Sequence, residues 1–373
     1  MGRIIVEQIL KIFWIFPIKQ DRVVFRSSQG TKYNCNPKYI SEYLRKYFPD
    51  KFELVWVFDN PEKYKFLENM EIKVYGEKSL KGLFHIITAK FLIDNHGIQS
   101  YIPVRKGQEV INTWHGGGSY KKSYANHSKK HIKYLEKMNR ETTVFLSSCE
   151  RFSNCNLRTI KESHPEKIMD SGLPRNDIFF RNNSEIALRV KQALGISTEK
   201  KLVLYAPTFR DDVTDENYKI DMETLLTAYK KRFGGDFVFA IRYHRFTKSN
   251  GENIWTSDVV DANGFEDMQE LIYASDIMIS DYSSCIWDAS LAYKPCFIYA
   301  MDLPKYLKNR NFYTPITDWP FPLAESIDEL VDNIEHFDDE AYRKKVNEHY
   351  IDLGSYEQGS ACEIVAKYMI SKL

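Results

Sequence analysis

Short apolar runs that alternate with helical or loop segments constrain the fold of this chain most strongly. Residues 22–26 (RVVFR) and 53–58 (ELVWVF) have the length and the Val, Phe and Trp content of buried strands, and Asn36-Pro37 opens a helix between them. Further runs of this kind follow at 90–94, 109–114 and 143–147. Alternating β and α elements predict an α/β fold with a parallel sheet and helices on both faces.

A second series of apolar runs begins after the polar stretch near residue 183. Its members lie at 201–205, 236–241, 276–280 and 295–299. A chain of 373 residues is also too long for one ordinary core. We therefore expect two Rossmann-like domains, with two or three helices from Ser326 onward that could pack on either one. The predicted division is 1–20, 21–182, 183–335 and 336–373.

The composition narrows the class of function. The net charge of +1 gives no reason to expect a polyanionic partner such as a nucleic acid. The six cysteines form no C-x-x-C pair and no zinc or disulfide spacing, which fits a reducing cytosol. We find no Walker A motif, no G-x-G-x-x-G and no Asp-x-Asp. No tightly bound cofactor and no metal site are therefore predicted, and Mg²⁺ carried by a substrate is left open.

The N-terminal residues 4–18 are apolar but interrupted by charge. They are too short to span a bilayer and lack the cleavage site of a signal peptide. One interpretation is an amphipathic helix at the membrane interface; the other is an ordinary first helix packed on the domain. The interfacial model inserts Phe13, Trp14 and Phe16 and places Arg3 and Lys11 among the headgroups.

The segment 111–122 (INTWHGGGSYKK) leads a histidine from a strand into a glycine-rich turn followed by cations. His115 titrates near neutral pH and can move a proton, and the glycines allow a phosphate or a backbone to approach. The alternative is a core histidine beside a flexible loop. The stretch 121–133 adds five lysines and two histidines without an acid. It could face anionic lipid or an anionic acceptor, or form a solvated surface.

Polar clusters also follow three strands of the second domain. They are 207–210 (PTFR), 242–245 (RYHR) and 281–284 (DYSS). Ligands bind at the carboxyl ends of strands in such sheets. Ser283 and Ser284 precede a predicted helix over 285–293, whose N–H groups favour an anion, although an N-cap role is the simpler reading. With Arg210, Arg242 and His244 nearby, the joint pattern suits a pyrophosphate.

Five blocks of sequence together resemble the CDP-glycerol glycerophosphotransferase family of wall teichoic acid and capsule synthesis. The blocks are Thr113–Gly116 with Lys121, Ser171–Asp177, Tyr205–Arg210, Arg242–His244 and Ser280–Ser284. The resemblance implies a GT-B architecture, in which two Rossmann-like domains face a central cleft. It also implies a cytoplasmic location, peripheral on the inner face of the cell membrane.

The resemblance further assigns roles to individual residues. His115 and His244 are the expected catalytic pair, with 21–182 as the acceptor-side domain and 183–335 as the donor-binding domain. The acceptor-side residues are Trp114, Gly116, Gly117, Lys121, Arg175 and Asp177. The donor-binding residues are Thr208, Arg210, Arg242, Asp281, Ser283 and Ser284. The chain departs from the family at Gly117-Gly118, where Thr-Pro is usual, and at Arg245, where Pro is usual; both departures affect acceptor or phosphate contacts.

The function expected from this resemblance is transfer of glycerol phosphate from CDP-glycerol to a hydroxyl of a lipid-linked or polymeric glycan, with release of CMP. His115 would take the hydroxyl proton, and the donor-side groups would stabilise charge on the pyrophosphate. Three alternatives stay open. They are transfer from CDP-ribitol or another CDP-alditol, glycosyl transfer from a nucleotide sugar, and a membrane-docked module that binds nucleotide-alditols without turnover.

Overall fold

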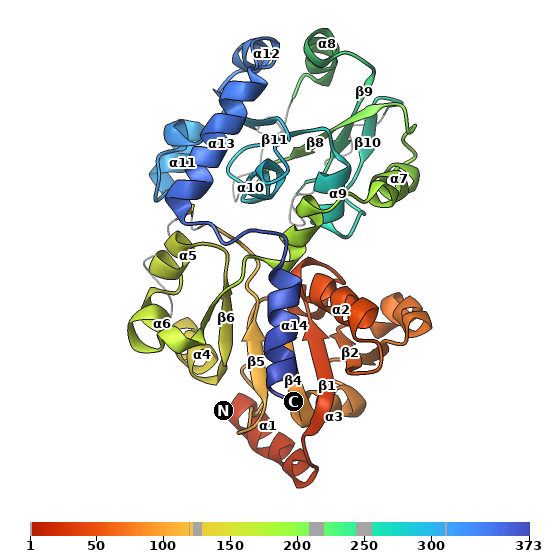
Figure 1. Cartoon of the computed structure of the whole chain (residues 1–373), viewed down its shortest axis with the longest axis vertical. Coiled ribbons are helices and arrows are strands. Elements are labelled where there is room, and N and C mark those ends of the chain that lie inside the picture. Colours follow the sequence, from red (N-terminus) through yellow and green to blue (C-terminus); the bar gives the residue numbers. More distant parts are fainter. Residues whose placement is uncertain (1, 119, 122–128, 209–219, 244–255, 310–311) are drawn as a thin grey trace. The chain divides into compact units, whose positions relative to one another are not determined.

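The structure is a computed structural model that describes residues 2–118, 120–121, 129–208, 220–243, 256–309 and 312–373. Its contacts divide the chain into two compact units (Figure 1). Unit 1 comprises Met1–Ser119, Ser123–Asp177 and Gly354–Leu373, and unit 2 comprises Tyr120–Lys122 and Ile178–Leu353. Each unit is an α/β fold around one parallel sheet, which confirms the predicted fold class.

The sheet of unit 1 has the order β3-β2-β1-β4-β5-β6-β7, with every pairing parallel. The strands are β1 (Lys19–Arg26), β2 (Glu53–Phe58), β3 (Lys73–Gly76), β4 (Ala89–Asp94), β5 (Glu109–Asn112), β6 (Val144–Ser147) and β7 (Ile168–Asp170). The strand order reverses direction between β1 and β4. Such a switch point is where an open α/β sheet offers a crevice at the carboxyl ends of its strands.

Helices cover both faces of this sheet because the side chains of each strand alternate between two cores. On one face α2 (Cys35–Tyr47), η3 (Pro61–Met70) and the C-terminal α14 (Ala361–Ser371) pack over Phe25 and Trp56. On the other face α1 (Gly2–Leu10) and α3 (Leu80–Thr88) pack over Val24 and Leu92. The rest of the unit contributes α4 (Lys129–Glu141), α5 (Glu150–Cys155), α6 (Arg158–Ser163) and η5 (Pro174–Phe180).

The sheet of unit 2 has the order β10-β9-β8-β11-β12-β13 and is also parallel throughout. Its strands are β8 (Lys201–Ala206), β9 (Phe237–Ile241), β10 (Val259–Asp261), β11 (Ile277–Ser280), β12 (Cys296–Tyr299) and β13 (Leu323–Ala324). Its helices are α7 (Ser184–Ala193), α8 (Met222–Phe233), α9 (Met268–Ala274), α10 (Cys285–Ser290), α11 (Leu303–Asn309), α12 (Ile327–Glu335) and α13 (Asp339–Leu353). Here the switch point lies between β8 and β11.

Three helices follow Ser326, where two or three were expected, and they belong to different units. Ser326 begins α12 by accepting a hydrogen bond from the Glu329 N–H. Helices α12 and α13 belong to unit 2, whereas α14 packs against α2 in unit 1 (Figure 1). The chain therefore returns to its first unit at Gly354.

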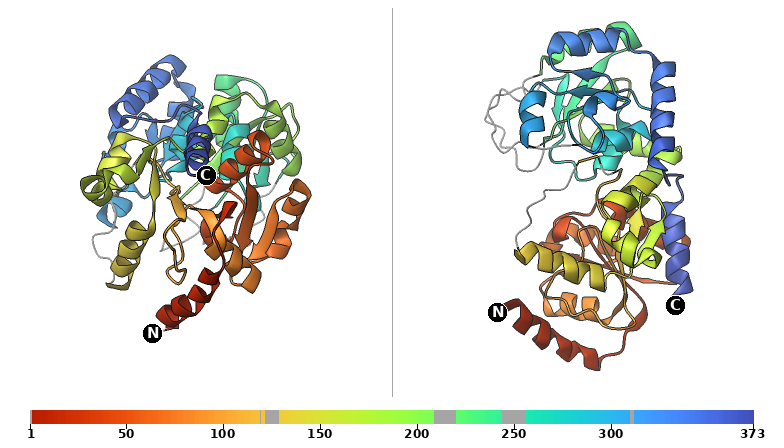
Figure 2. Two further views of the ribbon diagram at one scale, coloured as in Figure 1. Left: turned by 60° about the horizontal axis from the view of Figure 1, so that its bottom comes forward. Right: turned by 90° about the vertical axis from the view of Figure 1, so that its left-hand side faces the viewer.

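The N-terminal segment combines features of both of its interpretations. It forms α1 and a short helix, η1 (Lys11–Ile15), along the edge where the strands of unit 1 begin (Figure 2). Leu10 is buried, and both Phe13 and Phe16 contact the ring of Phe84. Trp14 and Phe16 nevertheless remain partly exposed, and so does a row of other apolar side chains: Ile5, Val6, Ile9, Ile12 and Ile15. Among the described helices, none is both long and apolar enough to cross a membrane.

Candidate active site

The glycine-rich motif of unit 1 begins where β5 ends, beside the switch point of the sheet. Trp114 has a φ of 55°, a left-handed conformation that costs a residue other than glycine about 1–3 kcal/mol. The Trp114 N–H donates to Asn112 Oδ1 over 3.0 Å. The buried Asn36 donates from Nδ2 to the carbonyls of Thr113 and Trp114, each over 3.0 Å. These hydrogen bonds hold the strained turn that presents the next residue, His115.

His115 is held by contacts on both its side chain and its backbone. Its Nδ1 lies 2.8 Å from the carbonyl oxygen of Asn95, which follows β4. Because a carbonyl only accepts, Nδ1 carries the hydrogen, and the neutral ring keeps its lone pair on Nε2. Arg175 Nη1 donates to the His115 carbonyl over 2.6 Å, and the Arg175 N–H donates to Asn36 Oδ1 over 3.1 Å. Arg175 therefore lies beside His115, as predicted for one site.

The environment of His115 favours the neutral imidazole. The side chain keeps exposed surface, yet many protein atoms surround it. This desolvation lowers the pKa of His115 below its usual 6.5; the hydrogen bond to Asn95 opposes the shift, and the charge of Arg175 adds to it. A ring that is neutral near pH 7, with Nε2 as its acceptor, is suited to act as a general base.

The three glycines after His115 differ in how much they are needed. A Cβ on Gly117 would lie 3.2 Å from Ser148 Oγ and 3.3 Å from Leu173 Cδ1, which is tighter than ordinary packing. Gly118 has a φ of 72° and donates its N–H to Ser148 Oγ over 3.3 Å. Gly116 has space, since its nearest neighbour is Trp114 Nε1 at 3.9 Å. The turn thus favours glycine at 117 for close packing and at 118 for its left-handed φ, and leaves Gly116 open.

Asp177 has a structural contact that its predicted acceptor-side role did not anticipate. Its carboxylate accepts the N–H groups of Ala361 over 3.0 Å and Cys362 over 2.8 Å, at the start of α14. It therefore caps a helix that lies 184 residues further along the chain. Arg175, two residues earlier, contacts the His115 turn instead.

In unit 2, Thr208 and Asp281 bind each other across the switch point. The Asp281 carboxylate accepts the Thr208 N–H at 2.9 Å and the Thr208 hydroxyl at 2.5 Å. It also accepts the N–H of Tyr282. The carboxylate joins the segments that follow β8 and β11, so it supports the shape of this edge.

Arg242 follows β9 and keeps unused donor capacity at the same edge. Its Nη2 donates to the Glu266 carbonyl over 3.2 Å, while the buried Nη1 has no hydrogen-bond partner among the described residues. Burial lowers the pKa of Arg242, and the carboxylate of Asp267 opposes the shift. A buried guanidinium nitrogen without an acceptor is costly, and an anionic ligand would satisfy it.

Ser283 and Ser284 lie where predicted, at the start of α10, but that helix is shorter than expected. It ends at Ser290, although the sequence suggested 285–293, because Ala292 and Tyr293 bond to the third residue before them and Tyr293 has a φ of 52°. Ser284 is exposed, and Ser283 Oγ accepts from Cys285 Sγ over 3.0 Å. A six-residue helix provides N–H donors but little dipole.

The remaining predicted residues fall into two groups. Lys121 belongs to unit 2, where it pairs with Phe312 and its Nζ lies 6.0 Å from the ring of Tyr306. Arg210 and His244 lie outside the described residues, as does most of the basic stretch 121–133. Within the described part of the chain, no group of three or more His, Cys, Asp or Glu side chains could hold a metal ion.

The sequence analysis missed Asn36, Asn95 and His96. The ring of His96 stacks on that of His115 with centroids 4.1 Å apart. One signal could have found the last two: both directly follow the apolar run that forms β4, at the same sheet edge as His115. Asn36 carried no such signal because it opens a helix.

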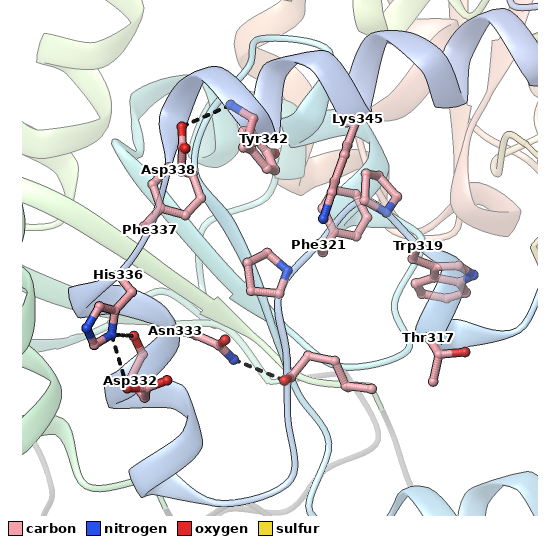
Figure 3. A pocket seen from close by; sticks show the side chains of 14 residues that line it. Thr317, Trp319, Phe321, Asp332, Asn333, His336, Phe337, Asp338, Tyr342 and Lys345 are labelled. Carbon is pink, nitrogen blue, oxygen red and sulfur yellow. Dashed lines mark hydrogen bonds and ion pairs between the residues drawn. The ribbon is translucent and has the colours of Figure 1, made fainter.

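Unit 2 also contains a cavity of about 470 Å³ beside β13, α12 and the start of α13 (Figure 3). Trp319, Phe321 and Tyr342 contribute aromatic surface. Much of its polar lining serves local structure: His336 Nδ1 lies 3.0 Å from Asp332 Oδ1, and Asn333 donates to the Leu323 carbonyl over 3.0 Å. None of the predicted site residues lines it.

Comparisons with known proteins match nearly the whole chain. A family model described as CDP-Glycerol:Poly(glycerophosphate) glycerophosphotransferase matches residues 8–371. A teichoic acid poly(glycerol phosphate) polymerase from Staphylococcus epidermidis is 30% identical over 372 residues, covering 93% of this chain and 50% of the relative. One from Bacillus spizizenii is 26% identical over 389 residues, covering 97% and 95%. This chain thus spans about half the length of the first relative. Ribitol-phosphate polymerases are also among the relatives.

A solved structure of the wall teichoic acid polymerase TagF is also similar. It matches with a TM-score of 0.82 at 25% identity, covering 98% of this chain and 93% of the other. This likeness confirms the predicted GT-B-like fold.

Proposed function

The chain belongs to the CDP-glycerol:poly(glycerophosphate) glycerophosphotransferase family, and we propose that it transfers glycerol phosphate from CDP-glycerol to a hydroxyl of a membrane-associated teichoic acid or related glycan acceptor. The observation that carries the proposal is His115, whose Nδ1 is fixed on Asn95 and whose environment keeps Nε2 unprotonated near pH 7. A hydroxyl nucleophile needs such an acceptor for its proton.

In the proposed reaction the acceptor oxygen attacks the β-phosphorus of CDP-glycerol. The bond between that phosphorus and the bridging oxygen breaks, and CMP leaves with the bridging oxygen. The acceptor proton passes to His115 Nε2. Phosphoryl transfer depends mainly on positioning and on electrostatic stabilisation of the phosphate oxygens, which we assign to residues of unit 2.

The donor-side proposal is supported by Arg242, Ser283 and Ser284. Arg242 Nη1 is buried without a partner among the described residues, and Ser284 is exposed at the first turn of α10. A pyrophosphate would accept from the guanidinium and from the hydroxyls. Thr208 and Asp281, which are hydrogen-bonded to each other, would stabilise this edge of the sheet. His244 and Arg210 keep their proposed donor-side roles from the resemblance alone.

The proposal is tested by product analysis with a panel of donors. The protein is incubated with CDP-glycerol, CDP-ribitol and UDP-sugars, each with a synthetic lipid-linked acceptor, and the released nucleotide and product length are measured. We expect CMP from CDP-glycerol and a lengthened acceptor. CMP from CDP-ribitol alone would identify the polyol as ribitol, and UDP release would identify a glycosyltransferase. A bound donor without turnover would favour a binding module.

We further propose that the N-terminal segment docks on the inner surface of the cell membrane. The exposed row of isoleucines supports this, and Ile9, Ile12 and Ile15 are 63%, 66% and 77% exposed. Each such side chain contributes about 1.5–3 kcal/mol when fully buried. Lys11 lies in this segment, and Arg105 donates hydrogen bonds to the carbonyls of Trp14 and Phe16 in it. Each cation near an anionic surface adds about 1 kcal/mol to binding.

A substitution series tests the docking proposal better than removal of residues 1–18, because that deletion would also remove the buried Leu10. We expect Ile9→Glu, Ile12→Glu and Ile15→Glu together to abolish sedimentation with anionic liposomes. The matched control is Ile351→Glu on α13, where Ile351 is 77% exposed. Unchanged liposome binding by the triple variant would contradict the proposal.

A further inference from the structure

Two imidazole rings stack face to face at the carboxyl edge of the unit 1 sheet. The centroids of His96 and His115 are 4.1 Å apart and their planes differ by 3°. His96 follows β4, and His115 follows the turn after the neighbouring β5. The stack therefore depends on the pairing of two strands.

Both rings are anchored on one residue, Asn95. Its carbonyl oxygen lies 2.8 Å from His115 Nδ1, and its side-chain Oδ1 lies 2.8 Å from His96 Nδ1. The Ser28 N–H also donates to Oδ1 over 2.9 Å, so this atom is the oxygen of the amide. Since both atoms of Asn95 are acceptors, both histidines carry hydrogen on Nδ1, and each neutral ring has its lone pair on Nε2.

The geometry excludes binding of one metal ion by both rings, which is the commonest use of paired histidines. A metal ion lies in the plane of each imidazole that binds it, and lone pairs in two parallel planes do not converge on one point. The close parallel rings instead interact through their faces and through charge. A proton on either ring disfavours a proton on the other.

We propose that His96 is a positioning residue for the reaction: its ring, anchored beside His115 on Asn95, fixes the plane and tautomer of the base and disfavours its protonation. This inference rests on the proposed function of His115. Without His96, the His115 ring would keep the Asn95 hydrogen bond and its contact with the Trp114 ring, whose centroid lies 5.3 Å away, but one face would lose its packing and the lone pair could tilt away from the acceptor hydroxyl. Such misalignment lowers turnover without changing donor binding.

Other charged and titratable groups surround the pair. The Asp94 carboxylate accepts the His96 N–H over 2.5 Å and is paired with Arg26, which also binds Glu77. Burial raises the pKa of Asp94, and Arg26 opposes that shift. The Tyr134 hydroxyl of α4 donates to the His96 carbonyl, and burial raises the pKa of this phenol. Arg175 binds the His115 carbonyl. The contacts to the His96 backbone persist in a side-chain variant, so a change at position 96 isolates the ring.

The test compares His96→Ala with His96→Phe, which restores a flat ring without a titratable group. We expect His96→Ala to lower the kcat plateau at high pH by roughly 10- to 100-fold and to leave the KM for CDP-glycerol unchanged. His96→Phe should return the plateau to within about threefold of the original. In both variants the acid limb of kcat should move to higher pH, because His115 loses the neighbour that competes for its proton. A purely structural role would leave that limb in place.

The matched control is His85→Phe. His85 of α3 is a buried histidine of unit 1 outside the site, and its ring stacks on that of Tyr75 in β3 with centroids 4.4 Å apart. Its variant should keep both the plateau and the pH profile. The proposal would be overturned if His96→Ala kept the kcat of the unmodified protein at high pH, or if the acid limb of kcat did not move in His96→Phe.

A second measurement does not depend on activity. Histidine-labelled NMR titration of the unmodified protein should show coupled titration of His96 and His115. In His115→Ala, His96 should titrate in one step at a higher midpoint, since the coupling is reciprocal. An unchanged His96 curve overturns the proposal, even where position 96 variants fail to fold. If the unmodified protein releases no CMP, the proposed function fails while this titration still decides the pairing.

Discussion

The candidate sites of the two units are built differently. In unit 1, hydrogen bonds from Asn36 and Arg175 and to Asn95 hold the His115 turn before any substrate is present. In unit 2, Asp281 and Thr208 are hydrogen-bonded to each other at the carboxyl edge of the sheet, but Arg242 Nη1 is buried without a partner among the described residues. A base must be oriented before the substrate arrives, whereas an anion-binding group gains its partner with the substrate. The predictions below test this contrast.

The largest effect is expected at His115. Replacing it by Ala should lower kcat by roughly 10² to 10⁴, because loss of a general base acts on the chemical step. The affinity for CDP-glycerol, measured by calorimetry, should stay nearly unchanged. His336→Ala, in the cavity of Figure 3, is the control and should retain full turnover. Near-normal turnover of His115→Ala with saturating acceptor would remove the base from unit 1.

Arg242 should show the opposite pattern. Replacing it by Met should weaken CDP-glycerol binding by roughly 10- to 150-fold, the value of one charge-assisted hydrogen bond of about 1.5–3 kcal/mol. Calorimetry measures the loss directly. Arg343→Met, on the exposed pair with Asp339 in α13, is the matched control. Unaltered donor affinity in Arg242→Met would mean that the unpaired Nη1 has no phosphate to bind.

Asp281 tests how much its hydrogen bonds to Thr208 stabilise the carboxyl edge of the unit 2 sheet. Replacing it by Ala removes the carboxylate that accepts the Thr208 N–H and hydroxyl, so we expect the free energy of unfolding to fall by about 1–3 kcal/mol. Asp281→Asn keeps one acceptor oxygen and should lose less. Chemical denaturation of the three proteins gives the ranking. Equal stability of Ala and Asn would show that the Thr208 contact contributes little.

The two sites also differ in how far the sequence predicts them. The interior strands were predicted because both of their faces are buried, which gives continuous apolar runs such as ELVWVF of β2. The four strands that were missed, β3, β7, β10 and β13, are the edges of the two sheets. They have two to four residues, some of them exposed, so their sequences carry no such run.

His115, Arg242 and Asp281 do lie at the carboxyl edges of the sheets, where the sequence placed them. Their position follows from the alternation of strands and helices alone, because each residue comes directly after a predicted strand. The partners of these residues could not be predicted in the same way. Asn95 meets His115 through the register between β4 and β5, and Asp177 reaches α14 across 184 residues. Long-range pairings of this kind depend on packing and leave no local pattern.

Asp177 provides a smaller test within unit 1. If its main role is the cap of α14, replacing it by Ala should lower the free energy of unfolding by about 0.5–2 kcal/mol. Turnover per folded molecule should then change far less than in His115→Ala. Thermal unfolding and acceptor kinetics are measured on the same preparation. A rise in acceptor KM that exceeds the stability loss would restore its predicted acceptor-side role.

The smallest effect concerns the pH dependence of unit 1. Desolvation lowers the pKa of His115 below 6.5, so more than half of the protein still carries the neutral base at pH 6.5. Since kcat follows the neutral fraction in the substrate complex, lowering the pH from 8 to 6.5 should reduce kcat less than about twofold. A histidine with an ordinary or raised pKa would lose half of its rate or more over this interval. The profile is measured with saturating donor and acceptor, and an acid limb centred above pH 6.5 would show that desolvation and the charge of Arg175 do not keep the His115 ring neutral.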